Sequence, residues 1–130
     1  MASIPEDLKY TKDHEWAQER DSVLVIGLTD HAQRQLGDIV FVELPKVGDS
    51  FEAGEPFGSV ESVKAVSEVY APVTGHVIKI NEMLSDSPES INDDAYGEGW
   101  LIEIRVENAA QVKELLTAAE YADYIKEEES

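Results

Sequence analysis

Short apolar or alternating runs, bounded by Gly, Pro, Asp and Ser, fill the first three quarters of the chain. Such runs predict β-strands, and no helical stretch of the roughly 10–15 residues typical of a βαβ connection separates them. The pattern therefore favours a mostly β fold, a sandwich or a barrel, over a parallel α/β sheet. The predicted strands span residues 22–27, 38–44, 56–62, 65–70, 75–80 and 100–106.

A short helix over residues 30–36 is predicted to interrupt the strands. Thr29 or Asp30 can accept hydrogen bonds from the first free amides of this helix, as N-cap residues do. Gly37 follows the last helical residue, where a left-handed glycine commonly ends a helix.

The C-terminal segment carries helical signals instead. Asn108 with Gln111, and Thr117 with Glu120, have the spacing of capping boxes. The two helices predicted from them span residues 109–116 and 118–126. The side chains expected to face the sheet are Val112, Leu115, Leu116, Tyr121, Tyr124 and Ile125. We expect Glu127–Glu129 to form a solvated, fraying tail.

Composition points to one domain over residues 1–130, with a core at about 20–106 and a helical extension at about 108–126. The chain is 42% hydrophobic, which is enough to form a core without disulfides or metal. Its formal net charge of −18 repels phosphate backbones and anionic lipid, so nucleic acid and membrane surfaces are unfavourable partners. No run of about 18 apolar residues could span a bilayer.

The chain contains no cysteine, so it has no disulfide framework, no thiolate nucleophile and no thiolate metal ligand. Any redox chemistry must therefore come from an attached group. Residues 1–10 lack an apolar run and carry Glu6 and Asp7, which argues against a signal or transit peptide. We expect a soluble monomer, cytoplasmic as the sequence stands and mitochondrial if a presequence has been removed.

A faint internal repeat aligns residues 37–43 with residues 75–81, either as two copies of a strand unit or by chance. Between the copies, two predicted strands fold back at residues 63–65 and place Lys64 at the tip of a hairpin. A lysine in a turn is usually no more than a solvated charge. Lys64 by itself is therefore weak evidence of function.

Other patterns argue against enzymatic chemistry in the chain itself. His14, His31 and His76 lack the spacing of a metal-binding motif, so no metal site is predicted. No Gly-x-Ser-x-Gly motif is present, and the glycines Gly97 and Gly99 precede a strand and so indicate a turn rather than a phosphate-binding loop. We expect a protein that is not an enzyme.

The segment Gly58-Ser-Val-Glu-Ser-Val-Lys-Ala65, followed by Ala71-Pro-Val-Thr-Gly-His-Val77, resembles the lipoyl-attachment motif of glycine cleavage H proteins. The resemblance extends from about Tyr10 to Tyr124. Further matching blocks are His14-Glu-Trp16, Ile26-Gly-Leu-Thr-Asp-His-Ala32, Val40-Phe-Val-Glu-Leu-Pro45 and Gly99-Trp-Leu101. Biotin carriers have methionine on both sides of the modified lysine, whereas this chain has Val63 and Ala65.

The resemblance implies a lipoyl/biotinyl-type barrel-sandwich hybrid of two antiparallel sheets, with lipoic acid attached to Lys64. It implies a carrier that takes the aminomethyl group from a pyridoxal-phosphate glycine decarboxylase to a tetrahydrofolate-dependent aminomethyltransferase. Dihydrolipoamide dehydrogenase would then reoxidise the dihydrolipoyl group, with NAD as the final acceptor. A lipoate ligase or lipoyl transferase would attach the arm.

A loaded arm needs shelter from water, and the resemblance points to a cleft lined by Glu15, with Asp13 and Glu68 as weaker candidates. Acidic groups there would favour the protonated amine of the cargo. The alternative is that all three are solvated surface carboxylates. Glu61 and Glu68 could also mark the lysine for the ligase, or simply belong to exposed strands. Some family members have histidine where Gln35 stands, so no histidine role is carried over to that helix.

Two other functions remain open at this stage. One is a lipoyl relay, in which the protein donates lipoyl groups to other lipoate-dependent enzymes. The other is an interaction module that keeps the fold and is never modified, although the intact motif around Lys64 argues against it.

Overall fold

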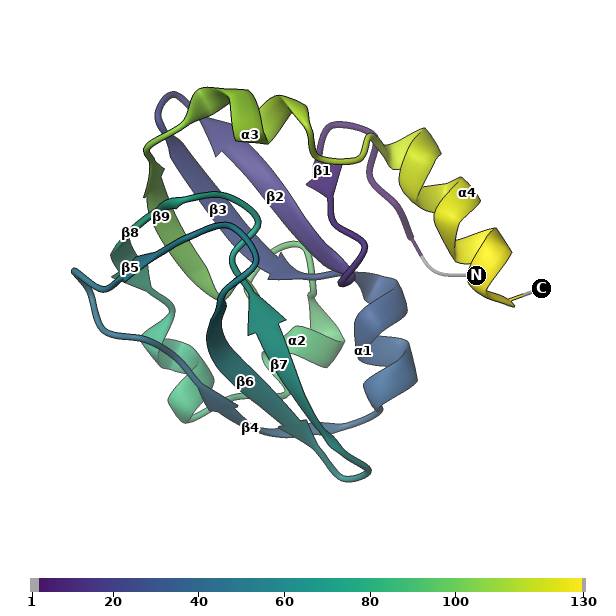
Figure 1. Cartoon of the computed structure of the whole chain (residues 1–130). Coiled ribbons are helices and arrows are strands. Elements are labelled where there is room, and N and C mark those ends of the chain that lie inside the picture. The colour runs from purple at the N-terminus through teal and green to yellow at the C-terminus, as the bar shows by residue number, and fades with distance from the viewer. Residues whose placement is uncertain (1–2, 130) are drawn as a thin grey trace.

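The alternating segments pair into two antiparallel sheets in the computed structural model, which describes residues 3–129 (Figure 1). The larger sheet has the strand order β1-β2-β3-β9-β8-β5, and the smaller sheet has the order β4-β6-β7. The strands are β1 (Lys9–Tyr10), β2 (Glu15–Arg20), β3 (Val23–Leu28), β4 (Ile39–Glu43), β5 (Ser50–Phe51), β6 (Pro56–Ser62), β7 (Val66–Tyr70), β8 (Gly75–Ile80) and β9 (Ile102–Val106). The mostly β architecture that was predicted is confirmed.

All six predicted strands are present, with bounds that differ by at most two residues. The sequence pattern missed β1, β2 and β5. Strands β1 and β5 have only two residues each, and β2 alternates poorly because a glutamate begins its buried half. The larger sheet therefore begins well before residue 20, where the core was expected to start.

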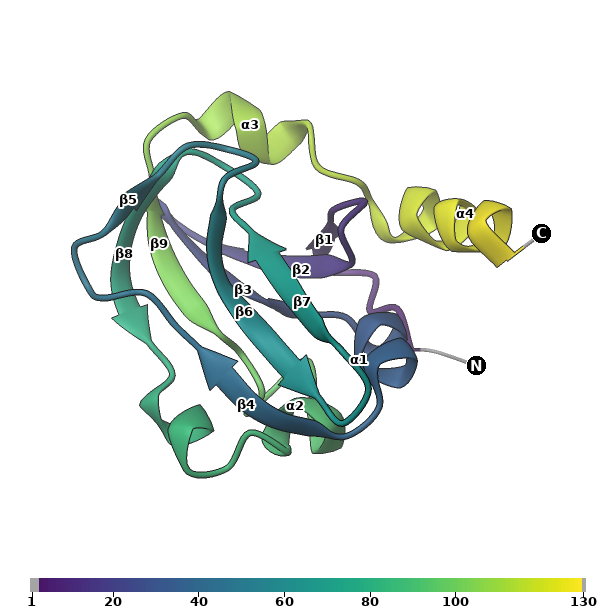
Figure 2. The same cartoon turned by 60° about the horizontal axis from the view of Figure 1, so that its bottom comes forward.

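The two sheets face each other across the main core, which includes Leu24, Ile26, Val60 and Val69. Strands β6 and β7 cross in front of the larger sheet (Figure 2), and Figure 1 shows the hairpin that joins them projecting past β4. A short 3₁₀ helix (Glu82–Ser85) and α2 (Ser90–Asp93), neither of which was predicted, connect β8 to β9.

Helix α1 (Asp30–Leu36) has the predicted bounds. The Thr29 side chain accepts a hydrogen bond from the amide of Ala32, so Thr29 rather than Asp30 is the N-cap. Gly37 ends the helix with φ = 82° and ψ = −155°. The positive φ confirms the need for glycine, although ψ lies outside the left-handed helical region.

The first C-terminal helix is shorter than predicted, because α3 (Ala109–Lys113) ends before residue 116. Asn108 caps the helix, but the Gln111 side chain accepts a hydrogen bond from the Thr74 amide, 2.6 Å away, instead of closing a capping box. Leu116 then pairs in an extended conformation with Tyr10, through two backbone hydrogen bonds of 2.8 Å.

The second C-terminal helix, α4 (Ala118–Glu129), is longer than predicted and continues through the glutamates that were expected to fray. Its capping box is confirmed: the Thr117 amide donates to Glu120 Oε1 (2.9 Å), and the Glu120 amide donates to Thr117 Oγ1 (3.2 Å). Tyr121 and Ile125 are buried, as expected, in a second cluster between α4 and the larger sheet. The other buried members of this cluster are Leu8, Tyr10, Trp16 and Val25.

Of the remaining side chains expected to face the sheet, Val112 is buried in the main core, and Leu115 packs against that core. Leu116 and Tyr124 pack against the second cluster. None of the helices within residues 3–129 is both long and apolar enough to cross a bilayer.

Replacing Glu120 tests the capping box. Glu120→Ala removes the acceptor for the Thr117 amide and should lower the free energy of unfolding by about 0.5–1 kcal/mol. Glu120→Gln keeps an oxygen at the same place and should behave like the parent. Urea unfolding and amide hydrogen exchange in the first turn of α4 would measure both. Equal loss in the two variants would mean that charge, rather than the cap, is responsible.

Candidate functional site

Lys64 lies at the tip of the β6–β7 hairpin, as predicted. The backbone of this tip is fixed by the hydroxyl of Ser62, whose Oγ accepts hydrogen bonds from the amides of Lys64 and Ala65, each at 3.1 Å. The Val63 amide donates to the carbonyl of Asp38 (3.0 Å), which ties the tip to the segment between α1 and β4. The lysine is thus presented on a rigid turn.

The aliphatic stem of Lys64 lies across the end of α1. A Cβ atom placed on Gly37 would be 3.0 Å from Lys64 Cε and 3.8 Å from its Nζ. The positive φ therefore favours glycine here, and the missing Cβ also leaves room for the end of the lysine side chain. The side chains of Val63 and Val66, next to the lysine, are 67% and 65% exposed.

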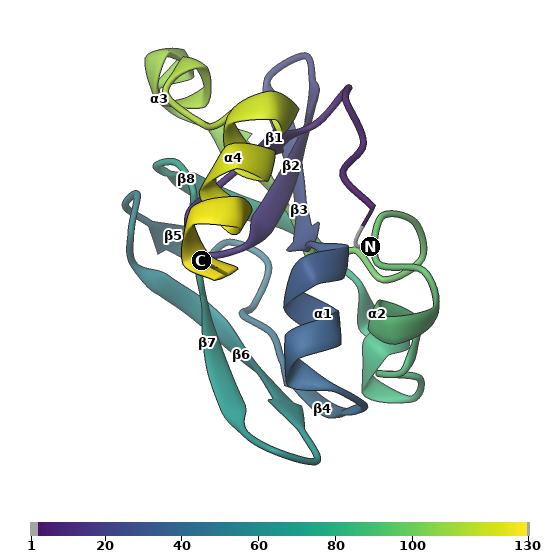
Figure 3. The ribbon, with the colours of Figure 1, turned by 90° about the vertical axis from the view of Figure 1, so that its right-hand side faces the viewer.

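A hollow of about 110 Å³ lies between α1 and β7, which stand side by side below β2 in Figure 3. Its lining includes Asp13 and His14 from the turn before β2, Ala32 and Leu36 from α1, and Ser67 and Glu68 from β7. Leu36 precedes Gly37, so the hollow starts beside the lysine stem. Its lining is mixed: Leu28, Ala32 and Leu36 are apolar, and the carboxylates are those of Asp13 and Glu68.

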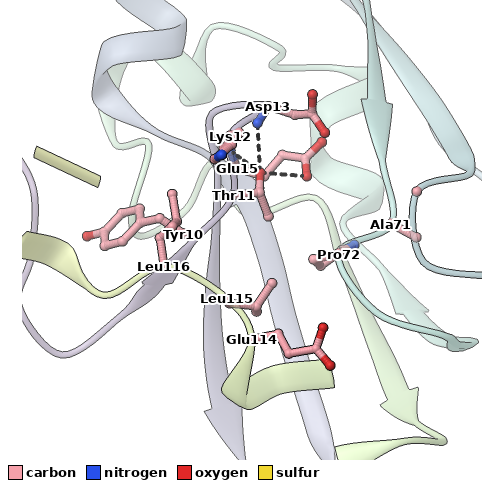
Figure 4. A pocket seen from close by; sticks show the side chains of 11 residues that line it. Tyr10, Thr11, Lys12, Asp13, Glu15, Ala71, Pro72, Glu114, Leu115 and Leu116 are labelled. Carbon is pink, nitrogen blue, oxygen red and sulfur yellow. Dashed lines mark hydrogen bonds between the residues drawn. The ribbon is translucent and has the colours of Figure 1, made fainter. Parts of the chain in front are cut away.

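Glu15 lies outside this hollow. Its side chain is 1% exposed, and Oε2 accepts a hydrogen bond of 2.6 Å from the amide of Tyr70 at the end of β7. Oε1 accepts a second bond from the Thr11 hydroxyl (3.2 Å). Glu15 instead lines a pocket of about 260 Å³ on the α3 side, together with Asp13 and Pro72 (Figure 4). Of the three carboxylates expected in one cleft, Asp13 and Glu68 share the hollow, and Glu15 lies in the neighbouring pocket.

Burial dominates the electrostatics of Glu15. The pKa of its carboxyl group is raised from 4.5 to about 8, mainly by desolvation and to a smaller degree by the negative charge of Asp13. The hydrogen bonds from the Tyr70 amide and the Thr11 hydroxyl act in the opposite direction, but they do not outweigh burial. At neutral pH the group is therefore mostly protonated.

The structure brings together two histidines that the sequence analysis treated as scattered. The ring centroids of His14 and His31 lie 4.8 Å apart, and His14 Nε2 is 3.1 Å from Glu128 Oε1 in α4. Burial lowers the pKa of His14, partly offset by the negative charge of Glu128. No spacing rule could have found this cluster, because its members come from three separate segments.

Replacing Glu15 with glutamine tests the buried carboxyl group. Between pH 4.5 and 8, the unfolded chain releases a proton from Glu15 that the folded chain retains, so the parent should lose stability as the pH rises. At pH 8.5 the loss in free energy of unfolding should be ~2–4 kcal/mol smaller in Glu15→Gln than in the parent. Urea unfolding at a series of pH values from about 4.5 to 8.5 would measure it. Glu19→Gln, on an exposed position of the same strand, is the control. An unchanged pH slope in Glu15→Gln would contradict the raised pKa.

Comparison with known proteins identifies the family of this chain. Residues 8–128 match the family model described as glycine cleavage H-protein. The glycine cleavage system H protein of Rubrobacter xylanophilus is 54% identical over 99% of this chain and 100% of its own length. That of Herpetosiphon aurantiacus is 56% identical over 98% of each chain. A crystal structure of a glycine cleavage system H protein from Mycobacterium marinum matches with a TM-score of 0.86 and 44% identity, covering 92% of this chain and 97% of the other. The chain belongs to the glycine cleavage H-protein family and has its barrel-sandwich fold.

Proposed function

We propose that this protein is the lipoyl-bearing shuttle of a glycine cleavage system, with the lipoyl group attached to Lys64. It carries the aminomethyl cargo from the pyridoxal-phosphate glycine decarboxylase to the tetrahydrofolate-dependent aminomethyltransferase, and it then presents the arm to dihydrolipoamide dehydrogenase. The observation that carries the proposal is the position of Lys64 on a rigid, projecting hairpin within the family's attachment motif.

The surroundings of Lys64 fit a covalent arm. Within residues 3–129, no salt bridge involves its ammonium group, so forming an amide there breaks no ion pair. The exposed turn is accessible to a modifying enzyme, and the bonds to Ser62 and Asp38 keep the backbone in place. When bound, the lipoyl group supplies a cyclic disulfide, a function that a chain without cysteine cannot provide itself.

The hollow between α1 and β7 supports a sheltering role for the protein. Part of its lining is apolar (Leu28, Ala32 and Leu36), and an arm packed against these side chains would be partly shielded from water. Asp13 and Glu68 at its sides favour a cationic amine over a neutral one. Glu15 does not line this hollow, but it supports the hollow indirectly. Its hydrogen bond with the Tyr70 amide fixes the end of β7, the strand that carries Glu68.

Mass spectrometry tests the attachment site. The full chain is produced together with an active lipoate ligase and lipoic acid, beside the variant Lys64→Arg. We expect the parent to gain the mass of one lipoyl group, mapped to Lys64 by peptide analysis, and the variant to gain none. Lys46→Arg, an exposed lysine away from the hairpin, is the matched control and should be modified like the parent. Absence of the mass shift, with the ligase active on another acceptor, would overturn the proposal.

The sheltering role is tested by the lifetime of the cargo. Glu68→Gln and Asp13→Asn should release the aminomethyl group, detected as formaldehyde, about 2–5-fold faster than the parent, as expected for losing a partly solvated charge pair. The matched control is Glu61→Gln, because Glu61 is exposed on the neighbouring strand and does not line the hollow. Equal release from Glu68→Gln, Asp13→Asn and the parent would refute this role.

A further inference from the structure

Three side chains from distant segments meet at the last turn of α4. Glu128 Oε1 lies 3.1 Å from His14 Nε2 and 4.0 Å from His31 Nε2. The potential ligand atoms of the three residues all lie within 4.8 Å of one another. Figure 3 shows how this arises: the end of α4 comes down beside the start of α1, next to the turn that precedes β2.

His14 is held in place by a buried network. Its backbone has φ = 66°, and its Nδ1 is 2.9 Å from the hydroxyl of Tyr121. That hydroxyl is 2.7 Å from Thr29 Oγ1, and Tyr121 is fully buried. Histidines that bind metals commonly have such a hydrogen-bond partner on the second ring nitrogen. The network leaves Nε2 of His14 directed at Glu128.

The donor set has a definite chemical preference. Two imidazole nitrogens and one carboxylate oxygen suit Zn²⁺ and similar transition metals, whereas Mg²⁺ and Ca²⁺ prefer oxygen ligands alone. Around tetrahedral zinc, neighbouring ligand atoms are about 3.3 Å apart. The distance from His14 to Glu128 already matches this value. The longer distances, 4.0 Å from His31 Nε2 to Glu128 Oε1 and up to 4.8 Å within the set, require the ligands to close around the ion. The Glu128 side chain, 36% exposed near the end of a helix, supplies part of this movement, and the imidazole rings supply the rest.

From this geometry we propose that His14, His31 and Glu128 form a binding site for a divalent transition metal of the Zn²⁺ class. The ion fastens α4 to α1 and to the turn before β2. It adds a structural tie at the back of the hollow that His14 and Asp13 line. Metal binding at this site requires no lipoyl group, so its test is independent of the proposed function.

Calorimetric titration of the full, chelator-treated chain with ZnCl₂, in the presence of excess Mg²⁺, tests the site. The excess Mg²⁺ occupies the many surface carboxylates of this acidic chain. We expect one saturable site per chain, and with Co²⁺ as the probe we expect the visible absorption of a four-coordinate ion with nitrogen ligands. Glu128→Gln and His31→Gln should each weaken Zn²⁺ binding about tenfold or more.

Two matched variants separate this site from adventitious binding. Glu127→Gln alters the adjacent exposed glutamate of α4, and His76→Gln alters the one histidine outside the cluster; both should bind Zn²⁺ like the parent. Hydrogen exchange of the α4 amides should slow when Zn²⁺ is added to the parent and stay unchanged in Glu128→Gln. No saturable binding under excess Mg²⁺, or equal affinity in the parent and Glu128→Gln, would overturn the proposal.

Discussion

The hydrogen bond from the Tyr70 amide to Glu15 is the contact on which the functional end of this protein depends. It joins β2 of the larger sheet to the end of β7 in the smaller sheet. An ionised carboxylate at this position would lower the stability of the fold, because burying a charge away from water costs free energy. Since burial keeps the Glu15 carboxyl group mostly protonated, the sheets are joined without burying a full charge.

With one end of the hairpin held by Glu15, the other end is held by Ser62 and by the carbonyl of Asp38. The backbone of the turn that carries Lys64 is therefore fixed from both directions. The remainder of the site follows the same logic: α1 and β7 form the walls of the hollow, and Asp13 and Glu68 supply charge without chemical reactivity. In the proposed function, the chain provides position and environment, and the attached lipoyl group would be the reacting group.

Sequence reasoning recovered the parts of this arrangement that local pattern controls. Strands β6 and β8 and helix α1 have the predicted bounds, because alternation and a threonine cap specify them locally. The sequence pattern did not predict β2, because a glutamate such as Glu15 is expected at the surface and is buried here. It extended α3 too far because Gln111 bonds to Thr74, a partner distant in sequence. The position of Lys64 was predicted, but the division of the acidic residues between two pockets and the meeting of His14 with Glu128 arise only from tertiary packing.

The turn at Ser62 has a consequence for how the protein matures. The Ser62 hydroxyl bonds amides only two and three residues ahead, whereas the Val63 amide reaches the carbonyl of Asp38 only in the folded chain, where β6 and β7 are paired. In an unfolded chain the same residues form an ordinary flexible peptide with no defined shape. An enzyme that recognises the turn by its shape acts on folded chains alone. Under the proposed function, such an enzyme would attach the arm to folded copies alone, and a misfolded copy would stay without one.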